Sequence, residues 1–355
     1  MIVVHMGLKK AGSTSIQAFL KDNEKSLRAL SVDYAHVGRR ERAAHHNFAR
    51  EIIKGLKKFD PEYGTLSGLT EYWRHAPGRT LVISSELLEE AEVEQIAVLR
   101  DILAQARKNE EFRIVLVLRE LLDLMPSSYA QKVKFGVRVA DFDSFFDERL
   151  QARRVNYFQT AKRWADVFGW HQLRVRLLDI KHLVNGDLID DFMAVCDLDL
   201  ASVQESIRRR PRISNTSPGW KTLEALRALF SAGDVSDLGY ASGAKLKLKE
   251  RKEIGKRAIK VGNELGWNDE KGYYLTRAQA QVCLEIFRSS IEALNECLPE
   301  PIPVPIDLES RGFRDREFLP DVGHIPTEEL RSFYKGIGAA RREWNVNDAP
   351  RIRPS

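Results

Sequence analysis

The segment Val3–Gln17, VVHMGLKKAGSTSIQ in one-letter code, constrains the fold more than any other part of the chain. An apolar run ends at Gly7, two lysines and Gly12 follow, and three hydroxyl residues stand where a helical pattern begins. This order predicts a strand, a glycine-containing turn and the N-terminus of a helix. Unpaired backbone N–H groups and the helix dipole would then face one point, which indicates a binding site for a phosphate or a similar anion.

The position of the lysines in this loop separates two families of anion-binding loops. The glycine spacing matches the nucleotide-triphosphate loop Gly-x4-Gly-Lys-Ser/Thr, but Ser13 occupies the position of its lysine. The loop instead resembles the 5′-phosphosulfate loop of sulfotransferases that use 3′-phosphoadenosine 5′-phosphosulfate (PAPS), approximately Pro-Lys-Thr/Ser-Gly-Thr/Ser-Thr. Here Lys9 replaces the usual proline, Lys10 is the motif lysine, and Ala11 replaces a hydroxyl residue. The alternative is a tight turn before a helix with an ordinary Ser/Thr cap.

A second motif supports the same resemblance. The apolar pattern Phe112–Leu118, interrupted only by Arg113, predicts a strand that ends at Arg119, and Ser127 follows eight residues later. In PAPS-dependent sulfotransferases a strand-ending arginine and a serine at this spacing hold the 3′-phosphate, so the resemblance assigns Arg119 and Ser127 to that role. A guanidinium suits a phosphate because its charge is permanent and its donors are paired. Alternatively, Arg119 ends a strand and Ser127 caps a helix.

Strand and helix patterns alternate along the first half of the chain. Strands are predicted at Ile2–His5, Thr80–Ser84, Phe112–Leu118 and Leu173–Leu178, and helices at Ser15–Leu30, His45–Leu56, Val93–Ala106, Phe142–Leu150, Asn156–Phe168 and Asp187–Cys196. This alternation predicts an α/β fold with a mainly parallel central sheet flanked by helices. The resemblance implies a P-loop nucleotide-hydrolase-like sulfotransferase fold. Ligands of such sheets bind beyond the carboxyl ends of the strands, where Lys10, Glu86 and Arg119 fall.

The resemblance covers residues 1–217, which we expect to form the PAPS-binding sulfotransferase core. Residues 218–300 are expected to be a helical extension packed on that core, and residues 301–355 an irregular C-terminal tail, all within one structural domain. Leu223–Phe230 and Ala278–Leu298 have helical patterns, while the charged segment Ala241–Lys260 is predicted to be a solvated helix or a mobile loop. Trp164 and Phe168 are four residues apart and are expected to pack in the core.

The resemblance implies transfer of a sulfuryl group from PAPS to a hydroxyl of a carbohydrate or glycolipid, with adenosine 3′,5′-bisphosphate as product and no metal. By analogy with phosphoryl transfer, most of the catalysis comes from positioning and electrostatics. We expect Lys10 to lie against the bridging oxygen and to stabilise the leaving group. Gly12, Ser13, Thr14 and Ser15 are expected to hold the 5′-phosphosulfate. Outside such a loop Lys10 would be a solvated surface charge.

A base must take the proton of the acceptor hydroxyl. Glu86 follows a predicted strand end and is the leading candidate, because a bound glycan would desolvate its carboxyl and raise its pKa. Glu86 is also suited to cap a helix or to pair with Lys10. His45 and His46 are alternative bases, whereas His5 lies in the first strand and is expected to be structural. Weaker candidates for contacts with the nucleotide or acceptor are Arg212, Asn215, Lys132, Lys134 and Arg138.

The composition of the chain limits the classes of molecule that it is expected to bind. The chain has 56 Lys and Arg against 51 acidic residues, and this net charge of +5 suits a polyanionic cofactor and an acidic glycan. Basic and acidic residues are interleaved, which disfavours nucleic acid. Cys196, Cys283 and Cys297 are scattered and indicate neither a disulfide framework nor a metal site. Without a signal peptide or membrane-spanning run, the sequence predicts a cytoplasmic, bacterial-type enzyme with only peripheral access to a membrane-linked acceptor.

Two other functions remain open at this point. An ATP-dependent small-molecule kinase of the P-loop type would require Mg²⁺ and a lysine at position 13, where the chain has Ser13. A catalytically inactive nucleotide- or glycan-binding protein would keep the fold and bind PAPS or adenosine 3′,5′-bisphosphate without turnover. Loops and the region after residue 217 are expected to determine the acceptor.

Overall fold

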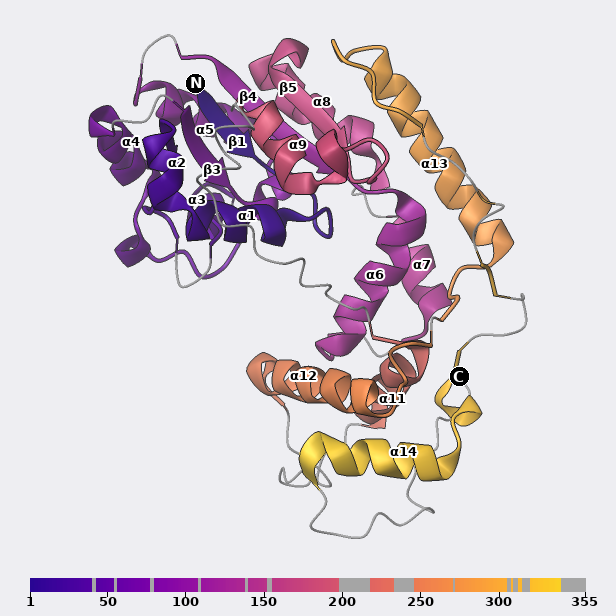
Figure 1. The fold of residues 1–355 in the computed structure, drawn as a ribbon. Coiled ribbons are helices and arrows are strands. Elements are labelled where there is room, and N and C mark those ends of the chain that lie inside the picture. The colour runs from indigo at the N-terminus through magenta and orange to yellow at the C-terminus, as the bar shows by residue number, and fades with distance from the viewer. Residues whose placement is uncertain are drawn as a thin grey trace. The chain divides into compact units, whose positions relative to one another are not determined.

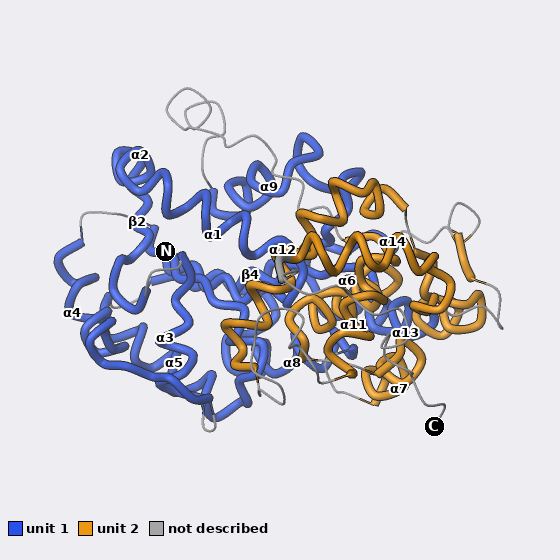
Figure 2. Tube along the Cα trace, turned by 90° about the horizontal axis from the view of Figure 1, so that it is seen from below, with its two compact units in different colours: residues 1–120, 153–213, 285–305 blue, residues 121–152, 214–284, 306–355 orange. Residues whose placement is uncertain are grey.

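The computed structural model describes residues 1–39, 43–53, 56–76, 80–107, 110–137, 140–151, 155–197, 218–232, 246–270, 272–304, 308, 312–314 and 320–339. The chain divides into two compact units (Figure 2). The first consists of residues 1–120, 153–213 and 285–305, and the second of residues 121–152, 214–284 and 306–355. Each unit therefore combines segments from three parts of the chain.

A five-stranded sheet forms the centre of the first unit, with the strand order β2-β3-β1-β4-β5 (Figure 1). Its strands are β1 (Ile2–His5), β2 (Val32–Tyr34), β3 (Thr80–Ser84), β4 (Phe112–Leu118) and β5 (Leu173–Leu177). Every pair of neighbouring strands is parallel, and Val4 of the central β1 lies opposite Ile83 of β3 and Ile114 of β4. The predicted α/β class with a parallel sheet is confirmed.

The short strand β2 has no counterpart among the predicted strands. It contains only three residues, and the middle one is Asp33, so it lacks the apolar run that identifies the other buried strands. Asp33 is fully buried, and both of its carboxylate oxygens accept from the Tyr72 hydroxyl, at 2.8 and 2.9 Å. A tertiary contact therefore satisfies a polar group that the local sequence gives no reason to place inside a sheet.

The helices of the first unit form two groups by their contacts. These helices are α1 (Ser13–Asp22), α2 (Glu24–Ala29), α3 (His46–Ile52), α4 (Leu66–His75), α5 (Val93–Ala104), α8 (Tyr157–Phe168) and α9 (Leu188–Val195). Helix α1 contacts α2 and α9, whereas α5 contacts α3, α4 and α8. Right-handed crossovers between parallel strands account for the two groups of helices. In the strand order, the connection after β1 leads towards β2 and the connection after β4 leads the opposite way, towards β5. Ligands of such sheets bind where these connections diverge, here at the carboxyl ends of β1 and β4.

The first helical segment differs from its prediction. Instead of one helix over Ser15–Leu30, α1 begins at Ser13 and ends at Asp22, and α2 follows after Asn23. The Asn23 side chain donates to the Phe19 carbonyl at 2.9 Å, so it satisfies a carbonyl of the last turn of α1 and helps to end the helix.

The core of the first unit consists of the central strands and the aromatic residues that cover them. Ile2, Val3 and Val4 are fully buried, and each such side chain contributes about 1.5–3 kcal/mol relative to an exposed one. Trp164 and Phe168 are buried in α8 with their rings stacked at 5.9 Å, which confirms their predicted packing role.

The second unit is built from helices. They are α6 (Leu121–Lys134), α7 (Phe142–Leu150), α11 (Trp220–Ala232), α12 (Leu248–Glu264), the first residues of α13 (Arg277–Asn295) and α14 (Thr327–Tyr334). The Tyr129 ring packs against those of Phe142 and Tyr274, at centroid distances of 5.3 and 5.4 Å. The predicted irregular tail after residue 300 is corrected by α14, in which Phe333 is fully buried. Of the charged segment Ala241–Lys260, residues 241–245 lie outside the described residues, and the rest enters α12.

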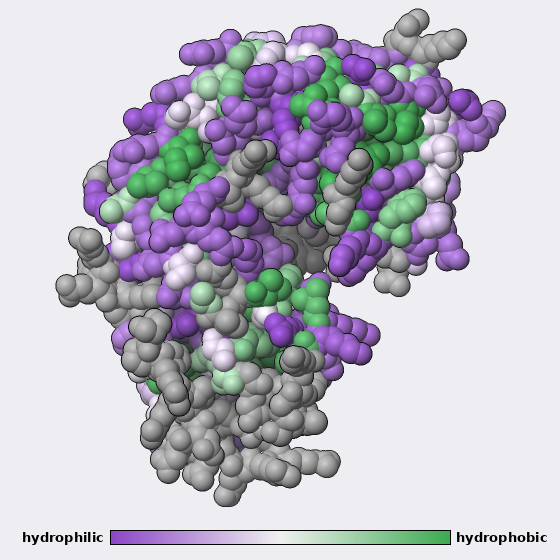
Figure 3. Space-filling view, turned by 180° about the vertical axis from the view of Figure 1, so that it is seen from behind, coloured by the Kyte–Doolittle hydropathy of each residue, from purple (hydrophilic) through white to green (hydrophobic). Residues whose placement is uncertain are grey.

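On the face drawn in Figure 3, hydrophilic residues cover most of the surface, and hydrophobic residues gather in separate groups between them. None of the described helices combines the length and the apolar composition that crossing a membrane would require. The three cysteines form no disulfide, and Cys196 and Cys283 are buried.

Candidate functional site

The loop between β1 and α1 has the backbone of an anion-binding turn. Lys10 and Gly12 have φ angles of 70° and 82°, in the left-handed region that favours glycine. For a lysine such a conformation is strained, and strain of this kind gathers at functional sites. Among the described residues, no acceptor is found for the backbone N–H groups of Gly12, Ser13 and Thr14. These groups lie at the N-terminus of α1, where they and the helix dipole favour an anion.

The two loop lysines have different surroundings. The Lys9 ammonium pairs with Glu90 at 2.6 Å, and the Lys9 backbone N–H donates to Glu89 at 3.3 Å. Lys9 therefore joins the loop to the short 3₁₀ helix Glu86–Glu90 that follows β3. Lys10 is half-buried and belongs to the strained part of the loop. The sequence motif and the backbone thus both distinguish Lys10 from its neighbour.

Arg119 lies next to this loop. Its Nη1 donates to the Lys10 carbonyl at 3.0 Å, and its own carbonyl accepts from the Tyr157 hydroxyl at 2.6 Å. The structure therefore brings together two predicted site residues that are 109 positions apart in the chain. Ser127 is half-buried in α6, which belongs to the second unit, so its partnership with Arg119 stays a prediction.

The hydroxyl residues after Gly12 differ in exposure. Thr14 and Ser15 are exposed, whereas Ser13 is buried and its Oγ lies 3.5 Å from the Leu8 carbonyl, with which it forms a long hydrogen bond. The exposed pair is accessible to a ligand without rearrangement. A side chain on Gly12 would place its Cβ 2.2 Å from Leu188 of α9, so the loop requires glycine for space as well as for its φ angle.

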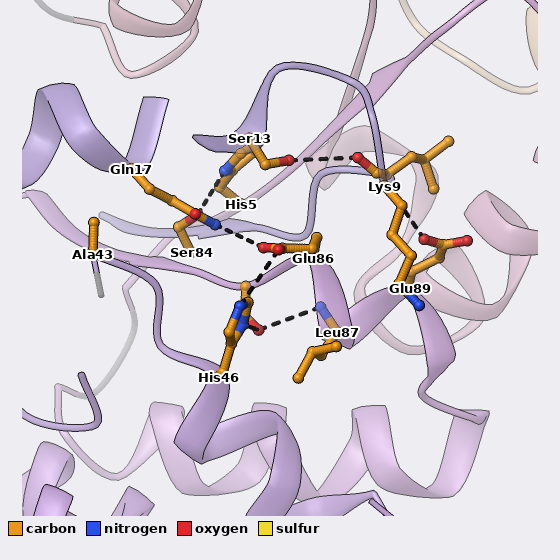
Figure 4. A network of polar contacts seen from close by, with 12 residues as sticks. His5, Lys9, Ser13, Gln17, Ala43, His46, Ser84, Glu86, Leu87 and Glu89 are labelled. Carbon is orange, nitrogen blue, oxygen red and sulfur yellow. Dashed lines mark hydrogen bonds and ion pairs between the residues drawn. The ribbon is translucent and has the colours of Figure 1, made fainter. Parts of the chain in front are cut away.

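Glu86 belongs to a hydrogen-bonded network at the carboxyl end of β3 (Figure 4). Its Oε2 accepts from the Gln17 amide at 2.9 Å, and its Oε1 lies 3.4 Å from His46 Nε2. Burial raises the pKa of Glu86, but the hydrogen bond and charge of His46 and the hydrogen bond from Gln17 outweigh it and lower the pKa to about 2. The raised pKa expected for a base is therefore not produced by the chain's own contacts.

The two neighbouring histidines have separate roles. His45 is buried, its Nε2 donates to the Ala35 carbonyl at 2.7 Å, and its Nδ1 accepts from the Ser84 backbone N–H at 3.1 Å. Burial lowers the pKa of His45 to about 3, so this histidine is neutral and connects the strand ends. His46 is half-buried, and its Nδ1 lies 2.9 Å from Ser85 Oγ. Of the two alternative bases, only His46 contacts Glu86.

The network continues from Glu86 to the first strand. The Gln17 amide also donates to Ser84 Oγ at 3.1 Å, and Ser84 Oγ lies 2.8 Å from His5 Nδ1. Gln17, Ser84 and Ser85 were not among the predicted site residues. The two serines at a predicted strand end could have been recognised from the sequence as site candidates. Gln17 stands in an amphipathic helix, and no sequence pattern marks it as a site residue.

The remaining candidates are distributed as follows. Lys132 and Lys134 are half-buried in α6 of the second unit. Arg138, Arg212 and Asn215 lie outside the described residues. The site supported by geometry therefore consists of the loop after β1, Arg119 at the end of β4, and the Glu86–His46 pair after β3.

Comparisons with protein-family models, with curated proteins and with solved structures find no match to this chain. Its function is therefore inferred from the residues of this site. Their arrangement offers backbone donors and a half-buried lysine to one anion and a guanidinium to a second. An ionised carboxylate, Glu86, stands at the end of β3 and is joined to α1 through Gln17.

Proposed function

We propose that the protein is a PAPS-dependent sulfotransferase that transfers a sulfuryl group to a hydroxyl of a carbohydrate or glycolipid. The observation that carries the proposal is the hydrogen bond from the Arg119 guanidinium to the Lys10 carbonyl. Because of it, a permanent cation lies beside the anion-binding loop, at the carboxyl ends of adjacent strands. PAPS carries two separate anionic groups, and this pairing of a loop with an arginine suits both of them.

Each part of the site has a role in this proposal. The N–H groups of Gly12, Ser13 and Thr14, with the hydroxyls of Thr14 and Ser15, bind the 5′-phosphosulfate. The Lys10 ammonium stabilises the charge that develops on the bridging oxygen as the S–O bond breaks. The donors of Arg119 that do not contact the loop bind the 3′-phosphate.

Glu86 is proposed to accept the proton of the acceptor hydroxyl. Its carboxylate is ionised at neutral pH because its pKa is about 2, and its side chain is 24% exposed, so a hydroxyl can reach it. An acceptor that covers the carboxylate excludes water and raises its pKa, which strengthens it as a base. His46 positions this carboxylate. We therefore assign proton acceptance to Glu86 and a positioning role to His46.

The kinase alternative receives no support from the loop. In the P-loop pattern the phosphate-binding lysine directly follows the second glycine, whereas here Ser13 holds that position, is buried, and donates from its Oγ to the Leu8 carbonyl. A catalytically inactive binding protein predicts nucleotide binding without turnover. Transfer of labelled sulfate from PAPS to a panel of glycans distinguishes that protein from an enzyme.

The nucleotide is tested by thermal unfolding with adenosine 3′,5′-bisphosphate, in comparison with ATP plus Mg²⁺. We expect the bisphosphate to raise the melting temperature and ATP plus Mg²⁺ to leave it unchanged. Arg119→Ala should weaken bisphosphate binding roughly 10- to 100-fold, because a hydrogen bond to a charged group contributes about 1.5–3 kcal/mol. Arg100→Ala, which removes a surface guanidinium bonded to Asp101, is the matched control. Stabilisation by ATP plus Mg²⁺ alone would contradict the proposal.

A further inference from the structure

We propose that His5 is a binding residue of the anion site and that its Nε2–H donates to an oxygen of the group held by the loop after β1. The identity of that group as a phosphosulfate rests on the proposed function, but the contact itself requires only a tetrahedral oxyanion. The sequence indicates a structural role for His5, and the surroundings of its ring give it this further one.

The His5 ring is fully buried, and its Nε2 has no hydrogen-bond partner among the described residues. Buried polar groups in folded proteins nearly always have partners, so an orphaned ring nitrogen requires an explanation. The direction of this nitrogen supplies one. A Cβ placed on Gly7 would lie 2.6 Å from His5 Nε2 and 2.3 Å from Ser13 Oγ. Nε2 therefore faces the loop beside the first residue of α1 (Figure 4).

The neighbours of the ring are compatible with a proton on Nε2. The Gln17 amide donates to Ser84 Oγ, so this oxygen already accepts one hydrogen bond. His5 Nδ1 lies 2.8 Å from Ser84 Oγ, and in the Nε2–H tautomer it accepts the hydrogen of the Ser84 hydroxyl. The proposal therefore includes the tautomer with the ring proton on Nε2, which makes this nitrogen a donor. Burial lowers the pKa of His5 to about 4, although the charge of Glu86 opposes this, so the ring is a neutral donor at physiological pH.

The surroundings of Nε2 select an anion as its partner. The N–H groups of Ser13 and Thr14 begin α1 and find no acceptor in the part of the chain that the structure describes, and the helix dipole adds positive potential there. Arg119 supplies a permanent positive charge through its contact with Lys10. Gly7 has no side chain, and a Cβ there would clash with both Nε2 and Ser13 Oγ, so only glycine lets the loop backbone pass this close to the ring. A buried nitrogen donor that faces a loop with two independent sources of positive potential suits a phosphoryl or sulfuryl oxygen.

Two substitutions of His5 distinguish the contributions of its two ring nitrogens to binding. In His5→Asn the amide occupies the place of Nδ1 and keeps the contact with Ser84, but nothing replaces Nε2. In His5→Gln the amide reaches the place of Nε2 and keeps a donor towards the loop. The probe is inorganic pyrophosphate, measured by calorimetry on the full chain. We expect His5→Asn to bind it about tenfold more weakly and His5→Gln to stay within about threefold of the wild type.

A second measurement needs no variant. In the wild-type protein, the ¹⁵N and ¹H resonances of His5 should show the Nε2–H tautomer and should shift when pyrophosphate is added. Unchanged resonances, or equal affinities of His5→Asn and the wild type, would overturn the proposal. If the protein binds pyrophosphate but not adenosine 3′,5′-bisphosphate, the proposed nucleotide is wrong. The affinities of His5→Asn and His5→Gln for pyrophosphate then decide whether His5 contacts the anion. Binding of neither ligand would refute both proposals.

Discussion

Two carboxylates, Glu86 in the first unit and Glu224 in the second, have pKa values shifted in opposite directions. Burial raises the pKa of both. For Glu86 the donors His46 and Gln17 outweigh burial and the pKa falls to about 2. For Glu224, which is 1% exposed, burial outweighs the charge of Arg227 and the pKa rises to about 7. The same type of side chain is thus held ionised in one region and close to its protonated form in the other.

The two carboxylates differ in how far their partners enclose them. Glu224 accepts from Arg227 Nε at 2.6 Å and from the Tyr274 hydroxyl at 3.2 Å, and Arg227 also binds Asp321 at 2.9 Å. These partners enclose the carboxylate, so no external molecule can reach it. Glu86 has comparable internal partners but keeps part of its side chain exposed. Accessibility, rather than the number of hydrogen bonds, marks Glu86 as the group suited to a ligand.

The largest effect is expected in the first unit, at the loop. Lys10→Ala should reduce sulfuryl transfer at least about 1,000-fold, because the charge of the leaving group loses its stabilising cation. Binding of adenosine 3′,5′-bisphosphate should be weaker but detectable. Lys9→Ala is the matched control and should retain turnover within about threefold, since Lys9 pairs with Glu90. Single-turnover transfer rates measure both variants, and full activity of Lys10→Ala would refute the role of this lysine.

A substitution in the second unit should lower the stability of the protein. Glu224→Ala leaves the Arg227 guanidinium buried without its main partner, which typically destabilises a protein by about 3–5 kcal/mol. Equilibrium unfolding in urea measures the change. Glu253→Ala removes a carboxylate that pairs with Lys256 on the surface of α12 and should leave the unfolding midpoint unchanged. If both variants lose the same stability, the distinction between enclosed and accessible carboxylates is wrong.

The two carboxylates should also give opposite pH dependences of stability. A pKa raised from 4.5 to about 7 means that the folded state holds the Glu224 proton more tightly, so stability declines as pH rises from about 4.5 through 7. A pKa lowered to about 2 means that the contribution of Glu86 is complete above pH 4.5 and is lost as pH falls towards 2. Glu224→Gln should abolish the decline between pH 4.5 and 7 and leave the acid limb unchanged. Thermal unfolding across this range tests the sign.

The smallest effect is expected from the link between Glu86 and the first strand. Gln17→Met removes one donor from Glu86 and one from Ser84, so the pKa of Glu86 should rise and stability should fall by about 1 kcal/mol. The readouts are the acid limb of the pH profile of transfer and the unfolding midpoint in urea. Gln105→Met, at an exposed position after α5, is the control. An unmoved acid limb would indicate that Gln17 does not act on Glu86.

Much of the first unit was predictable because its signals are local. β1, β3 and β4 follow from apolar runs and have the predicted bounds, and β5 was predicted although its apolar residues alternate with arginines. The alternation of strands and helices also predicts the parallel sheet, which places Lys10 and Arg119 at one edge. β2 was missed because Asp33 depends on Tyr72 for its burial, and no local pattern encodes a partner that distant in the chain.

The details of the site depended on tertiary contacts. The sequence placed Glu86 at a strand end, but its low pKa arises from His46 and Gln17, which come from two different helices. In the same way, His45 and His46 are adjacent in sequence, yet only the fold separates the buried structural ring from the one beside Glu86. Residue types identified the candidates, and packing determined their protonation.

The interleaving of the two units has a practical consequence for dissecting the molecule. Residues 121–152 leave the first unit between β4 and β5, and residues 285–305 return to it after most of the second unit has been formed. No single cut in the gene can therefore release either unit whole. A fragment that stops at residue 217 would lack a segment of its own unit, so functional studies by truncation should give way to studies of point variants in the full-length chain.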